Sequence, residues 1–162
     1  MSEVCSEIVD CVNKTAPIVD YETPYKMIRT TNVRNYKVDV SNVRYVEKNV
    51  FDIWNRRLTP QRGDVILTRE APVGEVGILE SDDNIFLGQR LMLYRANLEM
   101  ITPEYLLFFL MSENLKRQYE QVSSGSTVKH LSVVDCKKWK INLPPIHIQR
   151  EFSTFYQTKF YN

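Results

Sequence analysis

The sequence predicts a mixed α+β fold within one domain of 162 residues. Short valine-, isoleucine- and leucine-rich runs recur between turn-forming residues from residue 25 to residue 96, as is typical of strands. A longer apolar segment that begins at Thr102 has the capping residues of a helix. The last segment of the chain repeats aromatic residues at the three- and four-residue spacing of a helix face.

The first part of the chain combines helix and strand signals. Residues 1–14 are expected to form a short helix, because the valines and Ile8 recur at helix-like spacing. Pro17 prevents that helix from continuing. Residues 25–46 predict strands joined by an Asn-rich turn, and residues 49–58 predict a second short helix.

The middle of the chain predicts a hairpin. Residues 65–67 and 73–79 are expected to form its strands around the polar tip TREAP, with Pro72 and Gly74 shaping the return of the chain. Residues 91–94 predict another short buried strand.

The last third of the sequence is expected to be mainly helical. A helix that starts after the N-cap Thr102 should run to about Gln121, and its apolar segment should be sandwiched between other elements. Ser132 and Asp135 predict the capped start of a short helix that ends near residue 138. Residues 139–143 predict a further strand, and residues 149–161 predict the final helix.

The composition excludes a disordered chain. Aromatic residues make up 11%, and 21 basic residues nearly balance 20 acidic ones, which leaves a net charge of +1. Basic residues concentrate in residues 25–62 and 116–140, whereas acidic residues concentrate in residues 1–24 and 63–115. Such segregation can produce a surface that attracts a polyanion, or it can simply distribute charges over solvated faces.

The three cysteines form no CxxC pair, so neither a disulfide framework nor a zinc site is indicated. The longest apolar run, Tyr105–Met111, is far shorter than the roughly 20 residues that span a bilayer. The sequence therefore predicts a soluble, cytoplasmic protein with no membrane partner, no metal and no cofactor of its own.

Several blocks together resemble the target-recognition domain of a Type I restriction-modification specificity subunit. They occur in the order GDVILTREAPVGEVGIL, GQRLMLYR, GSTVKHLS and INLPPIHIQREF. The order and spacing of the blocks carry the resemblance, which extends over nearly the whole chain. It implies a single target-recognition domain in residues 1–145, with a twisted, mostly antiparallel sheet and packed helices. Residues 146–162 would begin a conserved dimerisation or spacer helix.

The resemblance also implies a function. Such a domain reads one half-site in double-stranded DNA and is not an enzyme, while separate methylation and restriction subunits use S-adenosylmethionine, ATP and magnesium. These subunits normally carry two recognition domains, so a chain with one would need a second copy or its missing half. The alternative is a half-subunit that binds the methylation subunit through its C-terminal helix without reading DNA alone.

Candidate base-reading residues follow from hydrogen-bonding chemistry. In the major groove, arginine suits guanine, whereas asparagine and glutamine suit adenine. Residues of these types on predicted turns or loop tips are Arg69, Arg34, Gln89, Arg90, Asn32 and Asn35. Arg69 and Arg34 are the first choices, and for Arg69 the alternative is a salt bridge to Glu70 or Glu75.

Phosphates are held by lysine, arginine, hydroxyl groups and free backbone amides. The predicted phosphate contacts are Ser124, Gly125, Ser126, Thr127, Lys129, Arg56, Arg57 and Thr68. Within the 124–129 loop, the alternative is an ordinary turn that caps the following helix. The aromatic stripe of the final helix either folds back on the domain or, as we prefer, packs against a partner helix. Its members are Phe152, Phe155, Tyr156 and Phe160.

Catalytic interpretations are weaker. A methyltransferase would need a glycine-rich turn and a [DN]PP[YFW] segment, and the sequence contains neither. The acidic pair Asp82 and Asp83 is more typical of a solvated turn than of a magnesium site. His130 and Cys136 are best interpreted as a polar loop residue and a buried thiol, and not as a nucleophilic pair.

Overall fold

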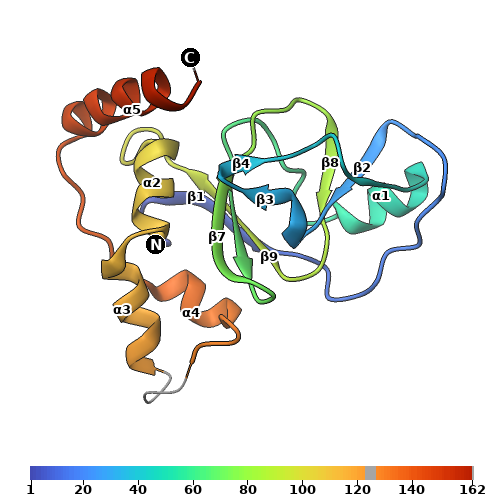
Figure 1. Ribbon diagram of the computed structural model, residues 1–162, viewed down its shortest axis with the longest axis horizontal. Coiled ribbons are helices and arrows are strands. Elements are labelled where there is room, and N and C mark those ends of the chain that lie inside the picture. Colours follow the sequence, from blue (N-terminus) through green and yellow to red (C-terminus); the bar gives the residue numbers. More distant parts are fainter. Residues whose placement is uncertain (123–126, 162) are drawn as a thin grey trace.

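The computed structural model describes residues 1–122 and 127–161 (Figure 1). The strands are β1 (Cys5–Asp10), β2 (Tyr25–Ile28), β3 (Val33–Arg34), β4 (Tyr36–Val38), β5 (Arg44–Tyr45), β6 (Val65–Arg69), β7 (Val73–Ile78), β8 (Asn84–Leu87) and β9 (Leu91–Ala96). The helices are α1 (Lys48–Trp54), α2 (Pro103–Leu110), α3 (Glu113–Val122), α4 (Val133–Lys138) and α5 (Ile146–Tyr161), with a 3-10 turn over Thr30–Asn32.

Two mixed sheets form the scaffold. The larger sheet has the order β1-β9-β6-β7-β4-β3, and the smaller has the order β5-β2-β8. Antiparallel pairing dominates, as predicted, but β4 pairs with β7 and β2 pairs with β8 in parallel. The expected hairpin is confirmed: β6 and β7 are antiparallel, with Ile66 opposite Gly77.

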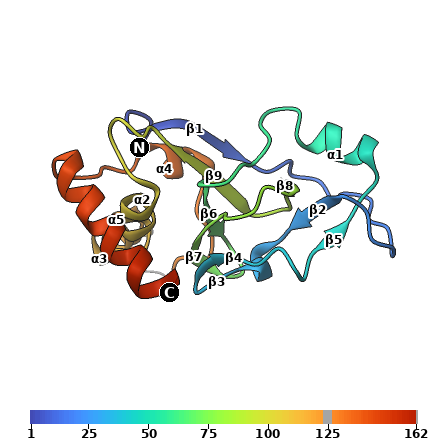
Figure 2. The ribbon, with the colours of Figure 1, turned by 90° about the horizontal axis from the view of Figure 1, so that it is seen from above.

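The core lies on both faces of the central strands β6 and β9. On one face, Val65, Leu67 and Tyr94 pack with residues from α2, α3, α4 and α5. On the other face, Ile66 and Leu93 pack with residues of β2 and β8. Figure 2 shows the result, with α2, α3 and α5 gathered at one end and β2, β5 and α1 at the other. A strand buried on both faces needs a continuous apolar run, which the sequence provides.

The predicted first helix is wrong. Residues 5–10 form β1, which pairs with β9 in antiparallel register, and the side chains of Val4 and Cys5 enter the core. A short apolar pattern does not distinguish helix from strand, and pairing with β9 decides the outcome here. The strand expected over residues 139–143 is also absent from the structure, in which Trp139 is instead a buried residue that packs against Tyr119.

The long helix expected after Thr102 divides into α2 and α3. The Ser112 hydroxyl donates to the carbonyl of Phe109 at 2.7 Å and accepts from the amide of Leu115 at 3.2 Å, so Ser112 starts a new helix. Most of the apolar segment is buried between the larger sheet and α5, as expected, with Leu106, Leu107, Phe109 and Leu110 in the core. Phe108 and Met111 are exposed.

Gln149 is a buried polar residue, only 1% exposed, that anchors α5 to the domain. Its Oε1 accepts from the amide of Thr102 at 3.1 Å, and its Nε2 donates to the carbonyls of Met100 and Pro144 at 3.0 Å each. All hydrogen atoms of the side-chain amide thus have acceptors, which makes this buried polar contact a specific one. Ser153 adds a hydrogen bond to the Thr102 hydroxyl at 2.9 Å.

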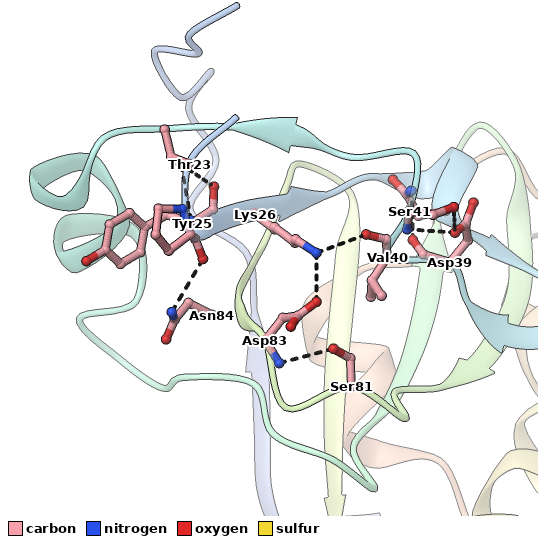
Figure 3. Close-up of polar contacts among 11 residues, drawn as sticks. Thr23, Tyr25, Lys26, Asp39, Val40, Ser41, Ser81, Asp83 and Asn84 are labelled. Carbon is pink, nitrogen blue, oxygen red and sulfur yellow. Dashed lines mark hydrogen bonds and ion pairs between the residues drawn. The ribbon is translucent and has the colours of Figure 1, made fainter. Parts of the chain in front are cut away.

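Polar contacts also fix the smaller sheet, as Figure 3 shows. The ammonium group of Lys26 on β2 contacts Asp83 at 2.7 Å and the carbonyl of Val40 at 3.5 Å. The Ser81 hydroxyl accepts from the amide of Asp83 at 3.0 Å and shapes the turn before β8.

Within the described part of the chain, no helix has the length and hydropathy of a membrane span.

Gly88 connects the two sheets. Its amide donates to the carbonyl of Ile28 at 2.8 Å, where β8 ends beside β2 and the chain turns into β9. A Cβ atom at this position would lie 2.6 Å from the same carbonyl oxygen and 3.5 Å from Cγ of Arg29. The missing side chain therefore lets the turn at residues 88–90 lie against the end of β2.

We predict that Gly88→Ala lowers the free energy of unfolding by about 1–3 kcal/mol, because the new methyl group overlaps a backbone oxygen that cannot move freely. Urea denaturation followed by circular dichroism measures the change. Gln121→Ala, at an exposed position on α3, is the control and should shift the free energy by less than about 0.5 kcal/mol. Equal stability of Gly88→Ala and the wild-type chain would contradict this packing argument.

Candidate nucleic-acid interface

Five segments converge at one edge of the molecule, which we call the loop edge. The strand registers produce this convergence: Thr68 lies opposite Leu91, Asp10 lies opposite Met92, and Ile28 lies opposite Leu87. The ends of β1, β2, β6 and β8 are therefore neighbours. The hairpin tip, the turn before β9 and the chain that enters α4 lie along the lower side of Figure 1. The loop edge comprises residues 11–16, 29–32, 69–73, 88–90 and 127–131.

Arg69 joins the hairpin tip to two other segments of the loop edge. Its amide donates to the carbonyl of Arg90 at 2.8 Å, and its carbonyl accepts from the amide of Leu131 at 2.8 Å. Its guanidinium Nη1 donates to the carbonyl of Leu131 at 3.2 Å. The predicted recognition loops around residues 68–70 and 127–129 are therefore adjacent.

A charged cluster lies beside this junction. One carboxylate oxygen of Glu70 is 3.0 Å from Nε of Arg90, and the other is 3.6 Å from Nδ1 of His130. These side chains are partly exposed, so the pairing contributes little to stability. Its effect is to orient Arg90, whose other guanidinium nitrogens make no hydrogen bond within residues 1–122 and 127–161.

A polar groove of about 330 Å³ runs along the loop edge. Its lining residues come from the segment after β1, from the end of β2 and the residues that follow it, and from the turn between β8 and β9. They are Lys14, Thr15, Ala16, Met27, Arg29, Thr30, Gly88, Gln89 and Arg90. This set contains three basic residues and no acidic residue. Anionic ligands are therefore favoured in the groove.

The structure contradicts the predicted exposure of three site residues. Asn32 is 2% exposed because its side chain bonds the amide of residue 29 and the carbonyls of residues 39 and 42. Thr68 is 0% exposed, and its hydroxyl accepts from the amide of residue 75 at 3.0 Å. Arg69 is 8% exposed, and its guanidinium donates to the backbone carbonyl of Leu131, while no ion pair with Glu70 or Glu75 occurs among the described residues. These side chains organise loops and present little surface to DNA.

Other predicted DNA contacts lie at the surface. Arg34 and Asn35 form the turn between β3 and β4, where the Arg34 guanidinium donates to the carbonyls of Thr30 and Val33. Arg56 is exposed after α1, whereas Arg57 pairs with Asp10 at 2.6 Å, near the end of β1. None of these three arginines lines the groove.

The predicted phosphate loop is described only in part. Thr127 and Lys129 are exposed in the segment that leads to the Arg69 junction. Ser124, Gly125 and Ser126 lie outside the described residues. The Ser132 hydroxyl accepts from the amide of Asp135 at 3.0 Å, so the predicted capped helix is confirmed.

An apolar groove of about 430 Å³ lies between α2 and α5. Its lining includes all the aromatic residues that we predicted on the final helix: Phe152, Phe155, Tyr156 and Phe160. Phe152 packs against Phe108 with ring centroids 5.3 Å apart, and Phe160 packs against Tyr36 at 5.5 Å. Phe155 also lines the groove and is 61% exposed. The stripe thus folds back on the domain with one face and leaves another open.

The candidate catalytic groups have structural partners. Asp82 pairs with Arg62 and Asp83 pairs with Lys26, and these contacts lower the pKa of both carboxyl groups. Burial raises the pKa of the Cys136 thiol to about 11, so this thiol is protonated at neutral pH. No metal-ligand cluster occurs among residues 1–122 and 127–161.

Lys14 and Arg29 were not selected from the sequence. Lys14 lies in a segment expected to be helical, and Arg29 immediately follows a predicted strand run, so neither had the character of a loop tip. Only the register of β1 with β9 and of β2 with β8 brings these residues to the groove.

Comparisons with a family model and with known proteins indicate the same family. The model of the Type I restriction modification DNA specificity domain matches residues 7–161. The specificity subunit of the Type I restriction enzyme EcoBI from Escherichia coli is 24% identical over 141 residues, which cover 87% of this chain and 30% of that subunit.

Solved structures show the same fold. The HsdS subunit from Thermoanaerobacter tengcongensis has a TM-score of 0.65 at 16% identity, over 96% of this chain and 35% of that one. A structure from work on the assembly and conformational transition of the type I R-M system has a TM-score of 0.67 at 17% identity. The match covers 97% of this chain and 36% of the chain in that structure. The chain spans about a third of the length of these relatives. With a family match that covers nearly every residue, the chain belongs to the Type I restriction-modification DNA specificity domain family.

Proposed function

We propose that the chain recognises one short half-site in double-stranded DNA for separate methylation and restriction subunits. In this proposal residues 1–145 form the recognition domain, and residues 146–162 begin a helix for partners or a second copy. The chain itself carries out no chemical step. It acts in the cytoplasm, which agrees with three cysteines that are all free.

The observation that carries the proposal is the convergence at the loop edge. The turn with Gln89 and Arg90, the hairpin tip and the segment with Lys129 are joined through the backbone of Arg69. Amide and guanidinium side chains are the groups that read base edges, and ammonium and hydroxyl groups hold phosphates. Backbone hydrogen bonds thus hold the segments that carry both kinds of group side by side on one edge, as selective recognition requires.

Gln89 is our first choice for base contact, with Arg90 second. Gln89 is partly exposed in the groove, and its side chain makes no hydrogen bond within the described residues, so its amide is available. Exposed Arg34 and Asn35 remain further candidates, and Thr127, Lys129, Arg56 and Arg57 remain candidates for phosphate contact.

We predict that Gln89→Ala relaxes the preference at one base position by about 1–3 kcal/mol, because a bidentate amide contact is lost. Sequencing of duplexes that the wild-type chain and the variant select from a random pool measures the preference. The control is Arg62→Ala, before the start of β6 and therefore at the end of that strand opposite to Arg69. The control should retain the wild-type preference.

If the wild-type chain selects a sequence and Gln89→Ala selects it with the same stringency, Gln89 is not a base contact. If the wild-type chain selects no sequence at all, independent reading of DNA is refuted. The second result would favour the interaction function described next.

The open aromatic groove favours a second candidate function, in which the chain binds the methylation subunit through α5 without reading DNA alone. An exposed phenylalanine beside a groove with mainly apolar walls is typical of a surface that binds a protein. The two surfaces are separate, because the apolar groove and the loop edge share no residue.

We predict that Phe155→Ser weakens binding to purified methylation subunit by about 2 kcal/mol, as expected for loss of an aromatic anchor. Calorimetric titration with and without duplex measures the affinity. Val122→Ser, which changes an exposed apolar residue on α3, is the matched control and should bind as the wild-type chain does. Unchanged affinity of Phe155→Ser would exclude this surface as the docking site.

A further inference from the structure

We propose that Lys14 and Arg29 form a clamp for a DNA backbone phosphate in the polar groove of the loop edge. This inference rests on the proposed function and adds residues that no sequence motif indicated. The groove also contains Gln89 and Arg90, so a phosphate held there would lie beside the side chains that we assign to base reading.

The first argument is chemical. Lys14, Arg29 and Arg90 supply the charged groups of the lining, and Thr15 and Thr30 supply hydroxyl groups. Ammonium, guanidinium and hydroxyl donors together are the set that holds phosphate oxygens. Glu70 already contacts Arg90, which leaves Lys14 and Arg29 without a carboxylate partner among the described residues.

The second argument is an unsatisfied donor. The Nε of Arg29 is buried and has no hydrogen-bond partner within the described residues. An unpaired buried N–H group is costly, and a hydrogen bond to an acceptor in the groove would remove that cost. If the guanidinium turns toward a ligand in the groove, a phosphate oxygen can accept from this donor.

The third argument is that the site is held in place before any ligand binds. The amide of Arg29 donates to Oδ1 of buried Asn32 at 2.8 Å, which fixes the backbone after β2. The Gly88 amide donates to the carbonyl of Ile28 at 2.8 Å, which holds the opposite wall. Two walls of the groove are therefore tied to one strand end, which lowers the entropy cost of binding.

The test is the salt dependence of DNA binding. Each phosphate contact contributes about 0.9 to the slope of log K against log salt concentration. We expect Lys14→Ala and Arg29→Gln each to make this slope shallower by about 0.9, equally on two mixed-sequence duplexes, because a phosphate contact is independent of sequence. Fluorescence anisotropy between about 50 and 200 mM salt covers the useful range.

Two controls separate a phosphate clamp from general charge. Lys48→Ala removes one positive charge from α1, where Lys48 pairs with Asp52, and it should leave the slope unchanged. Arg29→Lys keeps the positive charge, so its salt slope should be close to that of the wild-type chain. Because Lys14 is exposed, Lys14→Ala should fold normally even if Arg29→Gln is destabilised.

The outcomes distinguish this inference from the proposed function. A wild-type chain that binds neither duplex at about 50 mM salt contradicts both. Suppose instead that the wild-type chain binds both duplexes, and that Lys14→Ala and Arg29→Gln change the salt slope no more than Lys48→Ala does. This result contradicts the phosphate clamp alone. A loss that occurs on only one of the two duplexes would also refute it, because it would indicate a base contact.

Discussion

Three segments of the loop edge meet at the backbone of Arg69, and the candidate recognition surface depends on this junction. The amide of Arg69 binds the turn before β9, while its carbonyl and guanidinium bind Leu131. Backbone hydrogen bonds of this kind are directional, and burial makes them costly to break. The arginine that the sequence pattern assigned to DNA is therefore better understood as the residue that holds in place other groups for which we propose DNA contacts.

Polar side chains at four positions show why the site was only partly predictable. Sequence patterns located the hairpin tip and the turn with Gln89 and Arg90, because turn residues between apolar runs are local signals. They did not show that Asn32 would turn inward, since its three hydrogen-bond partners come from folding of the whole loop. Lys14 was missed because its position depends on the long-range pairing of β1 with β9.

The secondary-structure elements also differ in whether nearby residues or long-range contacts determine them. The caps at Thr102 and Ser132 and the hairpin strands were predicted from neighbouring residues, and the structure confirms them. The first strand, however, is defined by its partner β9, and the break between α2 and α3 depends on how the Ser112 hydroxyl bonds. Charge also depends on long-range folding: the chain is nearly neutral overall, yet three basic residues from distant segments line the groove.

The central claim is that DNA binds at the loop edge. Photo-cross-linking of the wild-type chain to duplexes that contain 4-thiothymidine, followed by peptide mapping, tests this claim most directly. The account predicts cross-links in the peptides that carry residues 88–90 and 127–131. Cross-links confined to α1, or to the loop with Asp82 before β8, would contradict it.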